Sequence, residues 1–127
     1  MTELEQARAK IAELERVIEA HNAEIERLRI ASLTYYIDID GTICNTTGED
    51  YANAQPIQAN IDKANALHQA GHRVVYWTAR GAGSGKDWWY LTMKQLRDWG
   101  CEFDELSFDK PVFDVVIDDR ARRWGEV

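Results

Sequence analysis

The sequence predicts an α/β fold preceded by a separate N-terminal helix, and three observations lead to that prediction. Residues 2–28 contain neither glycine nor proline, and their apolar residues recur at alternating spacings of three and four, which is coiled-coil periodicity. Residues 31–127 alternate β-rich runs with segments of helical periodicity, an order that favours a parallel sheet. Acidic residues directly follow the first and last of these runs. We therefore expect an oligomerisation helix at residues 1–30 and an α/β domain at residues 31–127.

Composition and charge restrict the classes of partner. Apolar residues make up 45% of the 127 residues and charged residues 29%, as in globular proteins. With 22 acidic against 15 basic residues, the net charge of −7 disfavours binding to nucleic acid or to an anionic membrane, since both attract basic proteins. No apolar run approaches the ~18 residues of a membrane span, and Cys44 and Cys101 lack the spacing of a disulfide or metal motif. We expect a cytoplasmic protein without membrane contact.

The N-terminal segment fits one uninterrupted heptad frame. Its two seam positions hold Leu4, Ile11, Ile18 and Ile25, and Ala7, Leu14, His21 and Leu28. Isoleucine at the first position and leucine at the second favour two parallel helices. The flanking pairs that would attract between such helices are Glu3 with Arg8, Lys10 with Glu15, and Glu24 with Arg29. We therefore expect a homo-oligomer formed through this helix, the alternative being an amphipathic helix packed on its own domain.

His21 is the polar residue of that seam. We interpret it as a residue that helps to set the register of the helices. The alternatives are a pH switch or a metal ligand.

The α/β domain is expected to have four strands and two helices. The strands are expected at residues 33–39, 73–78, 105–108 and 112–117, and the helices at 57–67 and 88–99. Pro56 suits the first turn of the earlier helix and Gly71 its end. Asp87 can cap the later helix, which Gly100 closes. This order predicts a Rossmann-like, mostly parallel sheet flanked by helices.

Polar residues gather where the expected strands end. Ligands of open parallel sheets bind at the carboxyl ends of the strands. The candidates are Asp38, Asp40, Gly41 and Thr42 at the end of the first strand, Thr78, Ala79 and Arg80 at the end of the second, Lys110 just before the fourth, and Asp118 and Asp119 after it. Each residue alone has an ordinary explanation, such as a turn or a surface lysine. Their occurrence in this order, each near a strand end, favours a functional site.

Residues ~33–121 resemble the haloacid dehalogenase superfamily of phosphohydrolases, which use an aspartate nucleophile. The DxDGT signature is residues 38–42 (DIDGT), the second motif is Thr78, the third is Lys110, and the acidic fourth is Asp118-Asp119. The runs YANAQP, GHRVVYWTARG and KPVFDVVIDDRA are similar to small bacterial and phage phosphatases associated with capsule or surface-polysaccharide biosynthesis.

The resemblance implies a role for each candidate. Asp38 would attack phosphorus and form an aspartyl-phosphate, while Asp40 would protonate the leaving oxygen and then activate water. The phosphoryl group would be bound by Gly41, Thr42, Thr78, Ala79, Arg80 and Lys110. Mg²⁺ is the implied cofactor, because carboxylates and a phosphate dianion repel one another without a cation. Its expected ligands are Asp38, Asp40 (through the backbone carbonyl), Asp118 and Asp119, and which of the last two ligates directly stays open.

Two classes of function follow from these residues. The first is a Mg²⁺-dependent phosphatase acting on a small sugar phosphate or an activated-sugar intermediate, with a phosphoprotein or a nucleic-acid 3′-phosphate as the alternative substrate. The second is a catalytically weak scaffold domain carried on a coiled coil; the presence of every catalytic residue type favours the enzyme.

The segments between the motifs are too short for a cap domain. Residues 43–55 offer only a loop, and residues 81–109 are accounted for by a loop, a helix and a strand. We therefore expect a site that is open to a large substrate or covered by another subunit. Residues 81–86 (GAGSGK) are expected to form a flexible rim loop, since Asp87 stands where a phosphate loop has serine or threonine. Trp88 and Trp89 are open to two readings, substrate lining and helix packing.

Overall fold

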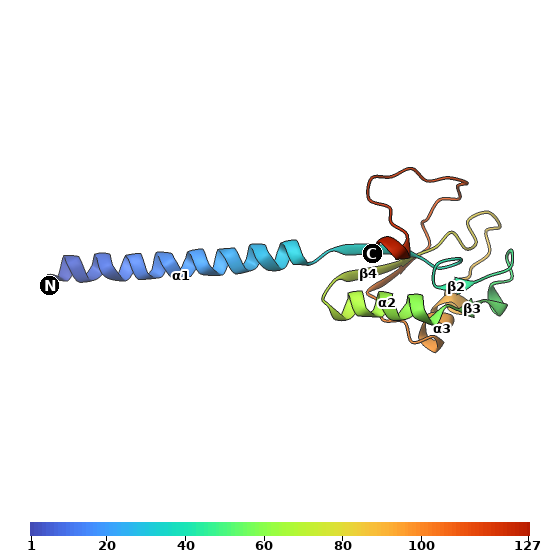
Figure 1. The fold of residues 1–127 in the computed structure, drawn as a ribbon, viewed down its shortest axis with the longest axis horizontal. Coiled ribbons are helices and arrows are strands. Elements are labelled where there is room, and N and C mark those ends of the chain that lie inside the picture. The colour runs from blue at the N-terminus through green and yellow to red at the C-terminus, as the bar shows by residue number, and fades with distance from the viewer. The chain divides into compact units, whose positions relative to one another are not determined.

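The computed structural model describes the backbone of residues 1–127 and the side chains of all residues except 28–31. The chain divides into two compact units, Met1–Leu33 and Thr34–Val127. Figure 1 labels the helix of the first unit and most of the helices and strands of the second. Two residues of the expected coiled coil, Leu28 and Arg29, have side chains outside the described part.

The first unit is one helix, α1 (Glu3–Ala31). Thr2 Oγ1 accepts the backbone N–H of Glu5 at 3.2 Å and so caps the helix. The apolar seam is exposed on this unit, with exposed fractions between 50 and 60% for Leu4, Ile11, Leu14, Ile18 and Ile25. The expected N-terminal helix is confirmed. Among the described residues, no helix is both long and apolar enough to cross a membrane.

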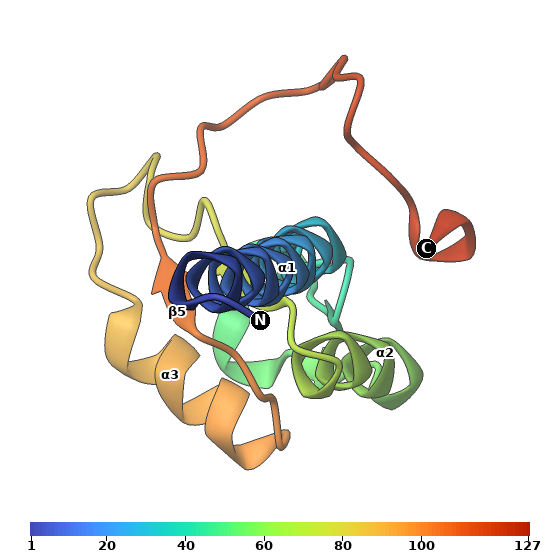
Figure 2. The same ribbon diagram turned by 90° about the vertical axis from the view of Figure 1, so that its left-hand side faces the viewer.

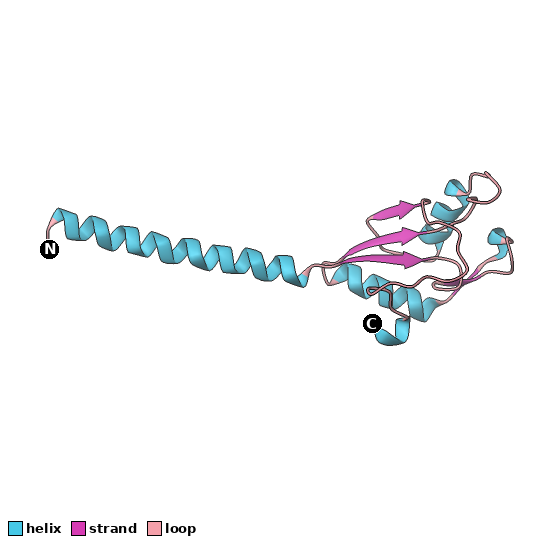
Figure 3. Cartoon of the chain, turned by 90° about the horizontal axis from the view of Figure 1, so that it is seen from above, coloured by secondary structure: helices cyan, strands magenta, loops and turns pink.

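The second unit is built on a three-stranded sheet. β1 (Thr34–Asp38) pairs in parallel with β4 (Arg73–Trp77), which pairs in parallel with β5 (Glu105–Ser107). Figure 3 shows the three strands pointing the same way. The connections run through α2 (Gln58–Gln69) and α3 (Trp89–Asp98). The predicted α/β class, with a mostly parallel open sheet flanked by helices, is confirmed.

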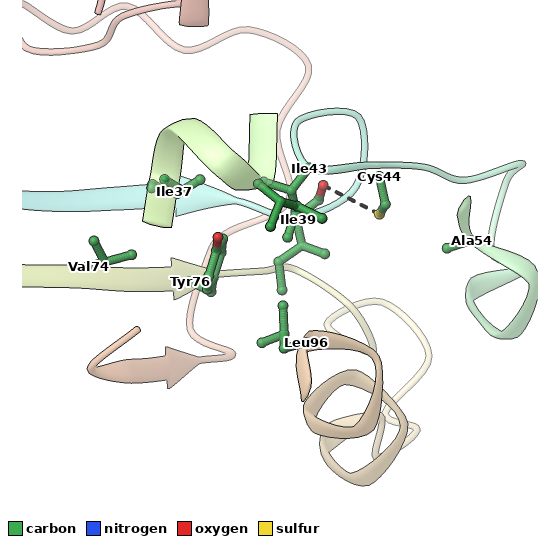
Figure 4. Packing of buried hydrophobic residues seen from close by; sticks show 10 residues of the cluster. Ile37, Ile39, Ile43, Cys44, Ala54, Val74, Tyr76 and Leu96 are labelled. Atoms are coloured by element: carbon green, nitrogen blue, oxygen red, sulfur yellow. Dashed lines mark hydrogen bonds between the residues drawn. The ribbon is translucent and has the colours of Figure 1, made fainter. Parts of the chain in front are cut away.

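Both helices lie on the same side of the sheet (Figure 2). The strand order β1-β4-β5 steps in one direction, and right-handed crossovers that step the same way place their helices on one face. Side chains confirm it, because Ile37 and Tyr76 share a face of the sheet and belong to the same buried cluster as Ile61 of α2 and Leu96 of α3 (Figure 4).

A short hairpin replaces the loop expected at residues 43–55. β2 (Cys44–Asn45) and β3 (Gln55–Pro56) pair antiparallel, and a 3₁₀ turn, η1 (Tyr51–Asn53), lies between them. Pro56 is therefore the last residue of β3 and not part of the first helical turn as expected. A proline is accommodated in an edge strand, where no partner needs its missing N–H. α2 begins at Gln58, two residues later.

The fourth strand expected at residues 112–117 is not present, and that prediction is wrong. Apolar side chains of this segment are exposed, by 73% at Val112, 76% at Val115 and 96% at Ile117. β-branched residues favour strands because they fit a pleated, half-buried surface, and here no neighbouring strand provides that surface. The segment belongs to an irregular stretch, residues 111–123, which we call the strap; a 3₁₀ turn, η2 (Trp124–Glu126), follows it.

Candidate active site

A tight turn at the end of β1 holds the two carboxylates of Asp38 and Asp40, which are two residues apart in the sequence. Ile39, between Asp38 and Asp40, is fully buried, and its carbonyl accepts the N–H groups of Thr42 at 3.1 Å and Ile43 at 3.0 Å. The turn requires a positive φ of 84° at Gly41, a conformation that glycine adopts readily. The DIDGT sequence therefore fixes the backbone of both acids.

Asp38 is accessible and lies beside a cation. Its Oδ1 accepts a hydrogen bond from Lys110 Nζ at 2.8 Å, and its Oδ2 accepts one from Thr42 Oγ1 at 3.2 Å. The Asp38 side chain keeps 32% of its surface exposed, against 16% for Lys110. A carboxylate in this setting can approach a dianion, because the ammonium group offsets the repulsion between them.

Aromatic rings and a neighbouring carboxylate hold Lys110 in place. Its Nζ lies 5.6 Å from the centroid of the Trp77 ring and 5.3 Å from that of Phe113, within the range of cation–π attraction. The preceding residue, Asp109, accepts a hydrogen bond from Trp77 Nε1 at 3.0 Å. The third motif thus reaches the end of β1 across the end of β4.

Asp40 is held in a closed network of donors. Arg80 donates from Nε to Oδ2 at 2.9 Å and from Nη2 to Oδ1 at 2.8 Å, and Thr46 Oγ1 donates to Oδ1 at 2.5 Å. Burial alone would raise the pKa of Asp40, but the hydrogen bonds from Arg80 and Thr46 and the charge of Arg80 hold the pKa below its usual value. Cys44 Sγ, 3.6 Å from Oδ1, adds a weak donor.

Arg80 is buried and has partners on every side. Besides Asp40, its Nη1 donates to Thr92 Oγ1 at 3.0 Å and to Gln95 Oε1 at 2.6 Å. The guanidinium carbon lies 4.7 Å from the centroid of the Tyr51 ring. The residue expected to bind phosphate is therefore placed, in this structure, against Asp40 and α3.

The remaining phosphate-binding candidates lie in the loops beside these two acids. Thr78 is 1% exposed, and its Oγ1 accepts the backbone N–H of Arg80 at 3.1 Å, which leaves the hydroxyl proton for donation to another group. Ala79 lies between them, and its carbonyl accepts the N–H of Ala82 at 3.0 Å. The N–H of Gly41 is bonded to the Cys44 carbonyl at 2.8 Å.

Asp118 and Asp119 are not brought to this cluster. Both are exposed and lie in the strap. The Asp118 carboxylate accepts the N–H of Arg120 at 2.8 Å, and the Asp119 carbonyl accepts Arg122 Nη1 at 3.2 Å. Within the described part of the chain, no group of three His, Cys, Asp or Glu side chains could hold a metal ion. The donor set expected for Mg²⁺ is therefore not assembled among these residues.

The strap begins and ends on the turn that carries Asp38. Lys110, just before it, contacts Asp38, and Trp124, just after it, donates from Nε1 to the Thr42 carbonyl at 3.2 Å. Lys63 of α2 donates to the Trp124 carbonyl at 2.9 Å. Residues 111–123 are thus a loop whose two ends are fixed at the candidate site.

The glycine-rich loop expected at the rim lines a shallow cavity of about 220 Å³ next to Arg80. Lys86 of this loop lines the cavity together with Asp87, Trp88 and Phe108. A Cβ on Gly81 would collide with the Lys86 carbonyl oxygen, so this close turn requires glycine. Trp88 packs edge-on against Tyr51, with ring centroids 5.1 Å apart, whereas Trp89 is 48% exposed.

Sequence reasoning missed the residues that hold Arg80 and Asp40 in place. They are Cys44, Thr46, Tyr51, Thr92 and Gln95. A signal existed for two of them, since Thr92 and Gln95 are polar, three residues apart and on the same side of α3 as the buried Leu96. The other three lie in a hairpin whose position depends on tertiary contacts, and the sequence carries no such signal for them.

Comparison with known proteins supports the fold and indicates no activity. No protein-family model matches the sequence, and no curated protein matches it. The crystal structure of a target protein from Vibrio cholerae is similar, with a TM-score of 0.63 and 25% sequence identity. The match covers 73% of this chain and 85% of that one.

Proposed function

We propose that this protein is a phosphatase of the haloacid dehalogenase type that hydrolyses phosphate monoesters through an aspartyl-phosphate on Asp38. One observation carries the proposal: an accessible carboxylate accepts hydrogen bonds from the Lys110 ammonium and the Thr42 hydroxyl, while a second carboxylate, Asp40, is fixed two residues away. Paired carboxylates of this kind, one accessible and one fixed, suit nucleophilic catalysis with proton transfer.

In the first step an Asp38 oxygen attacks phosphorus and the bond from phosphorus to the ester oxygen breaks. Arg80 holds the pKa of Asp40 below its usual value in the free protein, so Asp40 takes up a proton when the phosphate dianion binds beside it and raises that pKa. The leaving oxygen then takes this proton, so that an alcohol departs and Asp40 becomes a carboxylate again. Lys110 and the hydroxyl of Thr78 stabilise the charge on the transferring group. In the second step water attacks phosphorus, returns a proton to Asp40, and releases Asp38 and inorganic phosphate.

Mg²⁺ is part of this proposal as a cation that reduces the repulsion between carboxylates and phosphate. The ligands that the end of β1 offers are the Asp38 carboxylate and the Asp40 carbonyl oxygen. Asp118 and Asp119 would contribute only from another conformation of the strap.

The substrate we propose is a small sugar phosphate or an activated-sugar intermediate. Support comes from the cavity beside Arg80, whose lining includes Trp88, Phe108 and both charged residues Lys86 and Asp87; aromatic rings suit the apolar face of a sugar, and the charged groups can bind its hydroxyls and phosphate. The net charge of −7 disfavours a nucleic-acid 3′-phosphate. A phosphoprotein substrate and a catalytically weak scaffold are the alternatives.

A phosphate-release screen tests the activity. Sugar phosphates, nucleotides and phosphopeptides are supplied to the wild-type protein with and without Mg²⁺, beside Asp38→Asn as a matched control. We expect release from sugar phosphates that requires Asp38. No release from any of the three classes would favour the scaffold function instead.

We also propose that α1 joins copies of the chain into a homo-oligomer in the cytoplasm. The two free cysteines, Cys44 and Cys101, would stay reduced in that compartment. The exposed seam of α1 supports this. Two of the charges expected to pair between helices, Lys10 and Glu24, here pair within α1, with Glu13 and Arg27; an interface would therefore rest on the apolar seam more than on these ions.

Sedimentation of two α1 variants tests the oligomer. Ile18→Glu places a charge in the seam, while Ala20→Glu places the same charge outside it. We expect the first variant to lower the mass toward the monomer and the second to keep the wild-type mass. A monomeric wild-type protein would contradict the proposal.

A further inference from the structure

We propose that Arg80 is a positioning residue, which fixes the carboxylate of Asp40 for proton transfer to the leaving oxygen and does not itself bind phosphate. The inference rests on the proposed function, because it assigns a role within that reaction. It starts from the burial of the Arg80 side chain, which is 0% exposed beside an Asp40 side chain that is 26% exposed.

The hydrogen bonds of Arg80 leave no donor for a substrate. Nε and one Nη2 N–H are directed to the two oxygens of Asp40, and both N–H groups of Nη1 have acceptors in Thr92 and Gln95. The second N–H of Nη2 has Cys44 Sγ as a weak acceptor at 4.0 Å. Since a guanidinium has five N–H groups, a phosphate oxygen could be bound only after one of these contacts is broken.

The same contacts determine the orientation of Asp40. Two parallel N–H···O bonds from a planar guanidinium fix the plane of a carboxylate, which a single point charge does not do. Thr46 Oγ1 holds Oδ1 from another direction. Asp40 therefore cannot rotate about its side-chain bonds without losing several charge-assisted hydrogen bonds.

α3 in turn fixes Arg80. Thr92 and Gln95, three residues apart on this helix, both accept from Nη1. Gln95 also donates from Nε2 to the Tyr51 carbonyl at 2.5 Å, and the Tyr51 ring faces the guanidinium. The geometry of the proton donor is thus set by a helix that does not itself contact the nucleophile.

A positioned proton donor has a kinetic signature that depends on the leaving group. An alkoxide is a poor leaving group and needs a proton in the transition state, whereas 4-nitrophenolate leaves without one. A misplaced Asp40 should therefore slow hydrolysis of an alkyl phosphate more than that of 4-nitrophenyl phosphate. A defect in phosphate binding would raise KM for both esters.

The test uses the full-length protein with three variants. Arg80→Lys keeps the charge and loses the planar fork, Thr92→Val keeps Arg80 and removes one of its anchors, and Arg97→Lys is the matched control on the exposed side of α3. For Arg80→Lys we expect kcat on an alkyl phosphate to fall about 100-fold and on 4-nitrophenyl phosphate less than about 10-fold, with KM unchanged within about twofold. Thr92→Val should show the same selectivity with a smaller loss, and the control should equal wild type.

Other outcomes would contradict the positioning role of Arg80. Equal losses on both esters, or a raised KM with an unchanged kcat, would overturn the positioning role. If Arg80→Lys fails to fold, Thr92→Val carries the same test with the guanidinium in place. Wild-type protein that hydrolyses neither ester would reject the proposed function. The contact itself is then tested by ¹⁵N NMR, where the Arg80 Nε–H signal should shift on Asp40→Asn and an unshifted signal would refute the pairing.

Discussion

The acidic pair at the end of β1 and the acidic pair in the strap have the same composition and opposite surroundings. Asp38 and Asp40 accept hydrogen bonds from five side chains that come from outside β1: Thr42, Cys44, Thr46, Arg80 and Lys110. Asp118 and Asp119 are exposed, and their hydrogen bonds are made within the strap itself. The first pair lies at the end of a strand that pairs with β4, whereas the second follows a segment that is not part of a sheet.

This difference shows that a side chain is held in place when its backbone pairs with a neighbouring strand. β1 is fixed by its ladder with β4, and Ile39 buries the turn that follows. The strap is held just outside its two ends by Lys110 and Trp124 and near its start by Phe113, whose ring lies 5.3 Å from the Lys110 ammonium. An apolar sequence becomes a strand when a neighbouring strand pairs with its backbone, so the same residue type is held firmly in one region and exposed in the other.

The largest expected effect separates the two pairs by their chemistry. Asp38→Asn keeps the shape of the side chain but replaces the proposed nucleophile with an amide that cannot attack phosphorus, so turnover should fall by about 10³-fold or more. Asp114→Asn, in the strap, should leave the rate unchanged. Steady-state phosphate release measures both. An Asp38→Asn variant with more than a few per cent of the wild-type rate would exclude Asp38 as the nucleophile.

Metal dependence tests whether Asp118 and Asp119 bind Mg²⁺ together with Asp38 and Asp40. EDTA should abolish turnover and Mg²⁺ restore it, with Ca²⁺ a poor substitute because its coordination is larger and looser. If the strap supplies ligands, Asp118→Asn or Asp119→Asn should raise the Mg²⁺ concentration for half-maximal rate about tenfold or more. An unchanged Mg²⁺ titration in both variants would exclude these residues as ligands, and full activity in EDTA would exclude the metal.

A substitution in the turn after β1 should destabilise the protein more than a substitution in the strap. Ile39 is 0% exposed in the turn between Asp38 and Asp40, and Val115 is 76% exposed in the strap. Ile39→Ala should lower the free energy of unfolding by about 2–5 kcal/mol, because it leaves a cavity. Val115→Ala should change it by less than about 0.5 kcal/mol. Urea denaturation followed by circular dichroism checks both values, and a large loss in Val115→Ala would show that the strap is packed in solution.

Limited proteolysis measures the smallest of these contrasts. Within residues 34–127, trypsin should cut first after Arg120 or Arg122 in the strap, since exposed irregular chain is cut before packed elements. Arg80, which is buried, should resist. Mass spectrometry of the first fragments identifies the cuts, and an initial cut at Arg97 of α3 would contradict the expected order.

The sequence allowed most of the secondary structure to be predicted, together with part of the site. The three parallel strands, both helices and α1 lie where periodicity placed them, because each has an apolar face whose spacing is readable, buried in the strands, α2 and α3 and exposed in α1. Asp38 with Lys110 and Thr42 was also predicted to share a strand end, and these residues do meet. The β2–β3 hairpin was not predicted, because its strands have only two residues each and too few positions to show alternation.

Two outcomes depended on the tertiary structure alone. The first is the direction of the Arg80 side chain, which the sequence places near phosphate and the packing of α3 places against Asp40. The second is the backbone conformation of residues 112–117. Their valines predict a strand, but these residues pair with no described strand. The sequence by itself determined which residues stand at the end of β1, because burial periodicity and turn chemistry are local. Only the tertiary structure decided that Arg80 faces Asp40, because a hydrogen bond between residues 40 positions apart depends on how the helices pack on the sheet.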